Sequence, residues 1–104
     1  MKDSQKKINF YRQKIDEIDA KIVKLLNTRA EYANEIGKIK RELGLPVYVP
    51  SREEQVIAHV QKQNPGPLSE DAMRRLYERI IDESRRLEKD NYEKELQKNN
   101  AESS

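Results

Sequence analysis

Residues 25–40, LLNTRAEYANEIGKIK, lie inside the most regular hydrophobic repeat of the chain and also interrupt it. Apolar residues recur here at steps of three and four, as they do along one face of a long helix that pairs with another helix. We call this repeat the seam; its positions are Ile8, Tyr11, Ile15, Ile18, Ile22, Leu25, Arg29, Tyr32, Ile36, Ile39 and Leu43. Arg29 therefore puts a guanidinium where the repeat predicts an apolar side chain.

The composition limits how the chain can fold and what it can bind. Its 104 residues are 35% hydrophobic and 38% charged, so a single copy cannot bury a thick core. Because 21 Lys and Arg are balanced by 19 Asp and Glu, we expect no nucleic-acid partner. The chain has no Cys, and no apolar run approaches the roughly 20 residues that cross a bilayer. We expect a cytoplasmic protein that does not bind membranes.

The first predicted helix runs from about residue 6 to residue 43 and ends at Gly44, with Pro46 shortly after it. At a rise of 1.5 Å per residue it is about 55 Å long. Two short helices would only just cover such a length, and the seam is more naturally buried against a second copy of itself. We therefore expect an all-α, three-helix protomer with one very long first helix, in an intertwined, two-fold symmetric homodimer.

Two shorter helices are predicted after the long one. Ser51 and Glu54 form an S-x-x-E capping box at the start of the second helix, which ends at NPGP, residues 64–67. Ser69 is the expected N-cap of the third helix, whose periodicity is lost beyond about Tyr92.

The predicted helix boundaries also indicate which part of the chain forms the folded domain. The periodic part is expected to form the folded domain, and the polar ends are expected to lack order. The expected parts are a disordered N-terminus at residues 1–5, a helical domain at residues 6–92, and a frayed or disordered tail at residues 93–104.

Polar side chains on the inner helix faces are candidates for a site. Arg29 and Lys40 are about three turns apart and leave the same face of the first helix, with small residues between them. On the third helix, the apolar stripe continues into Ser84 and Glu88. Taken singly, each has an ordinary explanation as a buried ion pair, a side chain that reaches solvent, or a solvated helix end. Their occurrence together favours a site for an anionic ligand.

Three further candidates lie near helix ends. Arg52 and Glu53 open the second helix, where polar residues are common. Arg12 is about 42 Å from Lys40 along the same helix, so the two cannot share a site within one chain. Arg12 can reach such a site only across an antiparallel dimer seam. His59, the single His, is expected at the surface.

Four motifs make the chain resemble the all-helical, AroQ-type chorismate mutases. Their order and spacing together are specific, and they fall within about residues 6–92. The motifs are R-x-K-I-x-x-I-D at residues 12–19, L-L-x-x-R-A-x-x-A-x-x-I-G-x-x-K at residues 25–40, P-V-Y-x-P-x-R-E at residues 46–53 and I-I-D-E-S-x-x-L-E at residues 80–88. The resemblance implies a three-helix protomer in an intertwined dimer.

The resemblance also implies a reaction, the rearrangement of chorismate to prephenate in aromatic amino-acid biosynthesis. In this intramolecular, Claisen-type step the ether C–O bond breaks as a C–C bond forms, so we expect no cofactor and no metal. The resemblance implies that Arg29 and Arg12 of the partner subunit hold the two carboxylates of chorismate, supported by Arg52 and Ser84.

The catalytic residues implied by the resemblance are Lys40, Glu88 and Arg29. Lys40 would donate to a carboxylate and to the ether oxygen, where negative charge develops, while Glu53 would accept from the ring hydroxyl. Relatives have Gln or Glu at the position of Glu88, and a carboxyl must be protonated to donate there. Burial would raise the pKa of Glu88 and the cations of Arg29 and Lys40 would lower it. Val49 replaces an Asp that many relatives have, which puts orientation of the ring hydroxyl in question.

Two other functions are compatible with the sequence. An isochorismate pyruvate-lyase would use the same scaffold and similar cations, although the linker GLPVYVP at residues 44–50 matches the mutase pattern more closely. A non-enzymatic helical dimerisation module would explain the seam, but it predicts Leu or Ile at positions 29 and 84.

Overall fold

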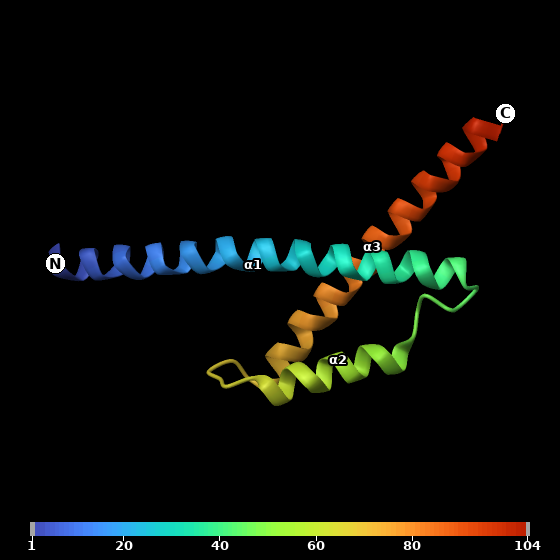
Figure 1. Cartoon of the computed structure of the whole chain (residues 1–104). Helices are drawn as coiled ribbons and strands as arrows, with labels where there is room; N and C mark the ends of the chain where they lie inside the picture. Colours follow the sequence, from blue (N-terminus) through green and yellow to red (C-terminus); the bar gives the residue numbers. More distant parts are fainter. Residues whose placement is uncertain (1, 104) are drawn as a thin grey trace. The chain divides into compact units, whose positions relative to one another are not determined.

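The computed structural model describes residues 2–103 and consists of three α-helices joined by two short connections (Figure 1). α1 spans Lys2–Glu42, α2 spans Pro50–Gln63 and α3 spans Glu70–Ser103. No strand occurs in this described range, so the predicted all-α, three-helix protomer is confirmed. None of these helices combines the length and hydropathy that a membrane span requires.

The chain divides into two units, and the division falls within α1. The first unit ends at Glu31, and the second begins at Tyr32 and contains the last part of α1 together with α2 and α3. In the first unit the apolar seam residues are open to solvent, with exposed fractions from 45% at Ile8 to 67% at Leu25, and Arg29 is half-buried. The seam positions of the second unit are likewise exposed. Neither unit covers its own part of the seam.

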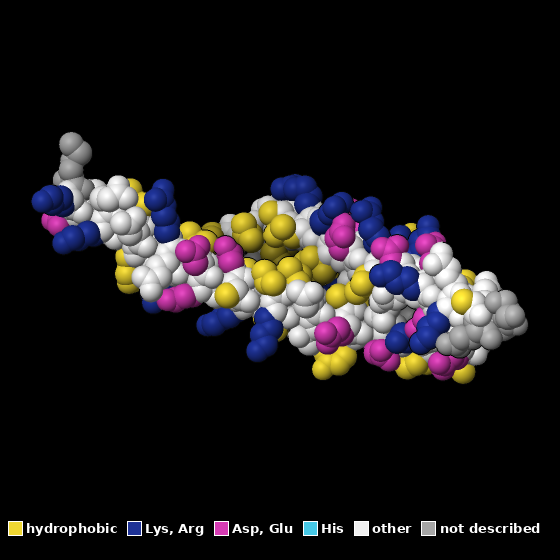
Figure 2. Space-filling view, turned by 90° about the horizontal axis from the view of Figure 1, so that it is seen from above, with side chains coloured by type: hydrophobic (Ala, Val, Ile, Leu, Met, Phe, Trp, Pro, Cys, Tyr) yellow, Lys and Arg dark blue, Asp and Glu magenta, His cyan; other side chains and the backbone are white. Residues whose placement is uncertain are grey.

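The core of the second unit is thin, as the composition predicts. α2 packs against α3, and Ile57 of α2, 3% exposed, is the single buried hydrophobic residue within the described part of the chain. Figure 2 shows hydrophobic side chains open to solvent, with Lys and Arg interspersed among Asp and Glu on the face displayed. Hydrogen bonds and ion pairs between side chains of different helices supplement this small core.

α1 ends in a Schellman motif. The N–H of Gly44 donates to the carbonyl of Arg41 at 3.2 Å, and the N–H of Leu45 donates to the carbonyl of Lys40 at 2.8 Å. Gly44 has a φ of +70°, a conformation in which a Cβ is unfavourable. This confirms the predicted helix end at Gly44.

The capping box predicted at Ser51 and Glu54 is wrong. α2 begins at Pro50, its N-cap is Val49, and no side chain caps it. Proline suits the first helical turn because its fixed φ is already helical and it has no N–H that needs an acceptor. Glu54 instead accepts two hydrogen bonds from Arg74 of α3, at 3.1 and 3.2 Å.

The connection between α2 and α3 is held by local hydrogen bonds. The side chain of Asn64 donates to the carbonyl of Leu68 at 2.6 Å and accepts from the N–H of Gly66 at 3.1 Å. The hydroxyl of Ser69 accepts from the N–H of Ala72 at 3.0 Å, which confirms Ser69 as the cap of α3.

Both terminal helices extend further than the sequence analysis predicted. α1 is already helical at Lys2, and α3 continues to Ser103 instead of ending near Tyr92. Residues 93–98, EKELQK, are strong helix formers without Gly or Pro, so their propensity for helix persists where the apolar stripe ends. The domain limits 6–92 stay a prediction, because a helix can continue beyond the edge of a domain.

Candidate functional site

The seven predicted site residues are divided between the two units. Arg12 and Arg29 belong to the first unit, where Arg12 is exposed and Arg29 is half-buried. The second unit contains the other five, which are Lys40, Arg52, Glu53, Ser84 and Glu88. Each of the three helices of the second unit thus contributes at least one of them.

The most buried polar side chains lie one turn apart on α3. Ser84 is 8% exposed and Glu88 is 9% exposed, and no other polar or charged residue in the described range is buried. In a chain with so little buried apolar surface, a hydroxyl and a carboxyl occupy positions that a purely structural helix would give to apolar residues. This is the strongest indication of a site in the second unit.

Gly37 of α1 makes room for the carboxyl of Glu88. A Cβ at Gly37 would lie 3.1 Å from Oε2 and 3.3 Å from Cδ of Glu88. A side chain at position 37 would therefore require the carboxyl to shift by a few tenths of an ångström. The small residue allows the carboxyl to lie against the backbone of α1, where water is largely excluded.

Arg41, which the sequence analysis did not identify, holds the backbone beside this carboxyl. Its Nη2 donates to the carbonyl of Glu88 at 3.3 Å, and its guanidinium lies 4.2 Å from the ring centroid of Tyr92. The one sequence feature that could have identified Arg41 is its position next to Lys40 in the last turn of α1. Cations are common there because they are favoured by the helix dipole, so this position carries little information about a site.

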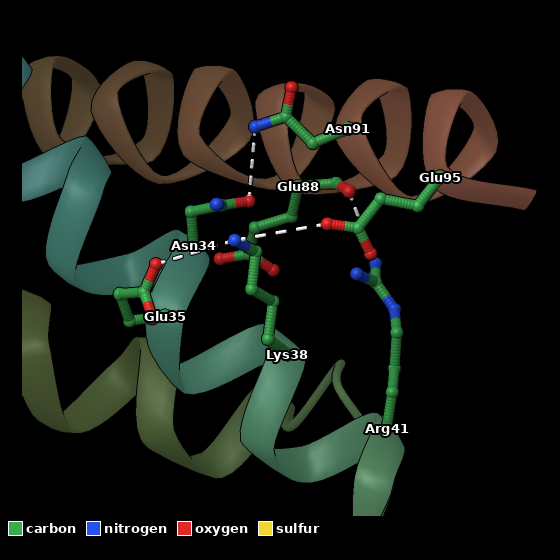
Figure 3. A network of polar contacts seen from close by, with 7 residues as sticks. All are labelled: Asn34, Glu35, Lys38, Arg41, Glu88, Asn91 and Glu95. Carbon is green, nitrogen blue, oxygen red and sulfur yellow. Dashed lines mark hydrogen bonds and ion pairs between the residues drawn. The ribbon is translucent and has the colours of Figure 1, made fainter. Parts of the chain in front are cut away.

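Further polar contacts join α1 to α3 beyond Glu88. Asn91 donates to Asn34 at 3.2 Å, and Lys38 lies 3.8 Å from the carboxylate of Glu95. Figure 3 shows Arg41 extending from α1 towards α3 alongside these pairs. The approach of α3 to α1 at Glu88 is thus supported by polar contacts on the following turns.

A second arrangement centres on Arg85 of α3. Its guanidinium binds the carboxylate of Glu53 at the start of α2 and stacks 4.3 Å from the ring centroid of Tyr48 in the connection between α1 and α2. It also lies 3.6 Å from Asp82 of its own helix. The sequence analysis missed Arg85 because it is one of many charged residues on α3, and nothing local distinguishes it.

The remaining predicted residues of α2 are less enclosed. Arg52 is exposed, whereas the side chain of Glu53 is only 25% exposed. Val49 is the N-cap of α2, and its carbonyl accepts from the N–H groups of Arg52 and Glu53 at 3.0 and 3.3 Å. This position therefore contributes its backbone to the start of α2. No group of three or more potential metal ligands occurs within residues 2–103.

Burial raises the pKa of the Glu88 carboxyl above its ordinary value. The cations of Arg41, Lys40 and Arg85 act in the opposite direction but do not cancel the effect of burial. The competition between burial and charge that the sequence left open is thus decided for burial. A carboxyl in this position keeps its proton to a higher pH than an exposed glutamate and is then a hydrogen-bond donor.

The family described as chorismate mutase type II matches residues 11–89. A chorismate mutase from Methanocaldococcus jannaschii is 33% identical over 89 residues, covering 85% of this chain and 90% of that protein. A bifunctional chorismate mutase/prephenate dehydratase from Neisseria gonorrhoeae is 39% identical over 79 residues, which are 76% of this chain and 21% of that protein. The chain thus spans about a fifth of the length of this bifunctional relative.

Solved structures agree with these sequence comparisons. The structure of chorismate mutase (form II) from Thermus thermophilus matches with a TM-score of 0.78 and 37% sequence identity. The match covers 80% of this chain and 94% of that one. Form I of the same protein matches with a TM-score of 0.73.

The raised pKa of Glu88 makes the stability of the protein depend on pH. The folded state binds the carboxyl proton more tightly than the unfolded chain does, so Glu88 stabilises the fold most below the ordinary glutamate pKa. This contribution is lost as pH rises through the folded-state pKa. We expect Glu88→Gln to remove it, as measured by urea unfolding across this pH range. Glu83→Gln, at an exposed position of the same helix, is the control, and equal pH profiles for Glu88→Gln and the parent would contradict the assignment.

Proposed function

Because the chain belongs to the chorismate mutase type II family, we propose that it catalyses the rearrangement of chorismate to prephenate. The observation that carries this proposal is the buried carboxyl of Glu88, held against Gly37 among cations of α1 and α3. The product links the reaction to aromatic amino-acid biosynthesis. The absence of Cys is compatible with the cytoplasmic location that we propose.

The reaction requires the protein to bind and orient its substrate. Chorismate is a dianion, and one electron reorganisation within the molecule breaks the ether C–O bond and forms the new C–C bond. No nucleophile or general base takes part. The rate then depends on holding the compact conformer and on stabilising the negative charge that develops on the ether oxygen.

We propose that the two carboxylates of the substrate are bound by arginine. Arg29 and Arg12 of the partner subunit are the main ligands, because a guanidinium can bind a carboxylate through two parallel hydrogen bonds. Arg52 and Ser84 support them. This role explains why the seam has a guanidinium at position 29, where Leu would serve dimerisation better.

Two donors are proposed for the ether oxygen. Lys40 donates from the last turn of α1, and Glu88 donates from α3 when it is protonated. The raised pKa of Glu88 supports this second role, because a permanently ionised carboxylate would repel the developing charge. Glu53 accepts from the ring hydroxyl through its carboxylate.

We further propose that the protein is a homodimer in which the seam is paired. Both units leave their apolar seam residues exposed, and an apolar stripe of this length is typical of an interface. Pairing of two antiparallel copies would bring Arg12 of one chain to the site that contains Lys40 of the other. The exposed seam is thus the observation that supports a shared site.

The first test is incubation of the purified protein with chorismate, with identification of the product. We expect prephenate, and we expect Arg29→Leu to lower kcat/KM by about 100-fold or more while the helical circular dichroism is unchanged. If residues 29 and 84 only support dimerisation, the parent shows no turnover, and Arg29→Leu is neutral or stabilising. Release of pyruvate from isochorismate, without prephenate from chorismate, would instead identify the lyase.

The shared site is tested by mixing two inactive variants. In a heterodimer of Arg12→Ala and Lys40→Ala chains, one site has both mutations and the other has neither. Co-expression should therefore restore about a quarter of the parent activity, because half of the dimers are mixed and each has one intact site. Each variant alone is the control. A mixture that stays inactive although mixed dimers are detected would place both residues of a site on one chain.

The donor role of Glu88 predicts a pH dependence of activity. Because only the protonated carboxyl donates, turnover should decrease as pH rises through its raised pKa. Glu88→Gln is a donor at every pH and should flatten this profile. A parent profile that is flat from acid to alkaline pH would contradict the role, and an unchanged alkaline decrease in Glu88→Gln would assign it to another group.

A further inference from the structure

We propose that Arg85 is a positioning residue, which fixes the carboxylate of Glu53 and the connection around Tyr48 in the geometry that binds the substrate. The inference rests on the proposed function and extends it to a residue that the family motifs do not single out. It is carried by contacts that Arg85 makes to two separate segments of the second unit.

The geometry of these contacts suits arginine. A guanidinium is planar, so its edge can bind a carboxylate while its face stacks on an aromatic ring. In Arg85, Nη2 binds the carboxylate of Glu53, and the central carbon of the guanidinium lies over the ring of Tyr48, 4.3 Å from its centroid. One side chain of α3 thereby ties the first turn of α2 to the connection that precedes it.

The bond to Arg85 also sets how Glu53 is presented. It uses Oε1 of the carboxylate and so restricts how the carboxylate can rotate. An acceptor for a single hydroxyl must lie within a few tenths of an ångström of its place to orient a ring. Without Arg85, the carboxylate would turn about its side-chain torsions and the connection would lose its stacking partner.

A second arginine–glutamate pair between the same two helices provides a comparison, because it is an ion pair with an exposed carboxylate. Arg74 binds Glu54 through two hydrogen bonds, and the side chain of Glu54 is 65% exposed. The side chain of Glu53 is only 25% exposed, and Arg85 is near enough to Glu88 for its charge to act on that carboxyl. Arg85 thus binds the proposed acceptor, and its charge acts on the proposed donor, whereas the hydrogen bonds of Arg74 go to Glu54.

The experiment is a double-mutant cycle on chorismate turnover by the full chain. Arg85→Met keeps the aliphatic stem and removes the guanidinium, and we expect it to lower kcat/KM about tenfold. In a Glu53→Gln background the same change should alter kcat/KM less than about twofold, because Arg85 acts through Glu53. Arg85→Lys restores the charge without the planar edge and should give an intermediate value. Arg74→Met is the matched control and should keep the parent kinetics.

Three results would overturn the inference. They are parent kinetics in Arg85→Met, an equal loss with and without Glu53→Gln, and an equal loss in Arg74→Met. If Arg85→Met does not fold, the cycle is run with Arg85→Lys, and the same criteria apply. An inactive parent protein would overturn the proposed function together with this inference, whereas an active parent with unchanged Arg85 variants would overturn this inference alone.

Discussion

At Gly37 the backbone of α1 comes so close to Glu88 that a Cβ would lie 3.1 Å from the carboxyl oxygen. This approach places the carboxyl where solvent is largely excluded, and the exclusion raises its pKa despite the neighbouring cations. Arg41 reaches the backbone of Glu88 across the same contact. The proposed chemistry needs a neutral donor at this point, and the absence of a Cβ at Gly37 leaves room for the carboxyl against α1.

The second unit is held together by few apolar contacts and by several polar ones. Ile57 is the one buried hydrophobic residue within residues 2–103, while arginine side chains join α3 to α2 and to the preceding connection. Exposed ion pairs contribute little to stability, typically about 0–1 kcal/mol each. The apolar residues of the seam are exposed in this protomer, and their burial against a second copy is the physical reason for the proposed dimer.

The two arginine–glutamate pairs between α2 and α3 differ in their surroundings, and the difference separates a structural pair from one proposed to serve the site. Arg74 and Glu54 lie in solvent and link two helices, and their geometry explains the lowered pKa of Glu54 through the hydrogen bond from Arg74. Arg85 and Arg74 are similarly exposed, but the side chain of Glu53 is 25% exposed against 65% for Glu54, and Arg85 also contacts an aromatic ring. Two pairs of the same chemistry between the same helices can therefore have different functions, and burial together with the third contact distinguishes them.

The sequence by itself determined the helices, their ends at Gly44 and Ser69, and the seam with its guanidinium at position 29. These features depend on periodicity and on hydrogen bonds between residues a few positions apart, so they can be read locally. The four motifs likewise led to the family. Among the local predictions, the Ser51 capping box was wrong because Pro50 starts the helix without a side-chain cap, and α1 and α3 extend beyond the predicted limits near residues 6 and 92.

Only the tertiary structure decided the direction in which the pKa of Glu88 is shifted and which residue binds Glu53. The contact of Arg41 with Glu88 joins residues 47 positions apart, and that of Arg85 with Glu53 joins residues 32 positions apart. The burial of a side chain depends on how the helices pack. Local sequence also does not specify which charged residues lie near that side chain in space, or at what distance. The sequence thus identified the carboxyl at position 88, and the packing of α3 against Gly37 determined that its pKa is raised.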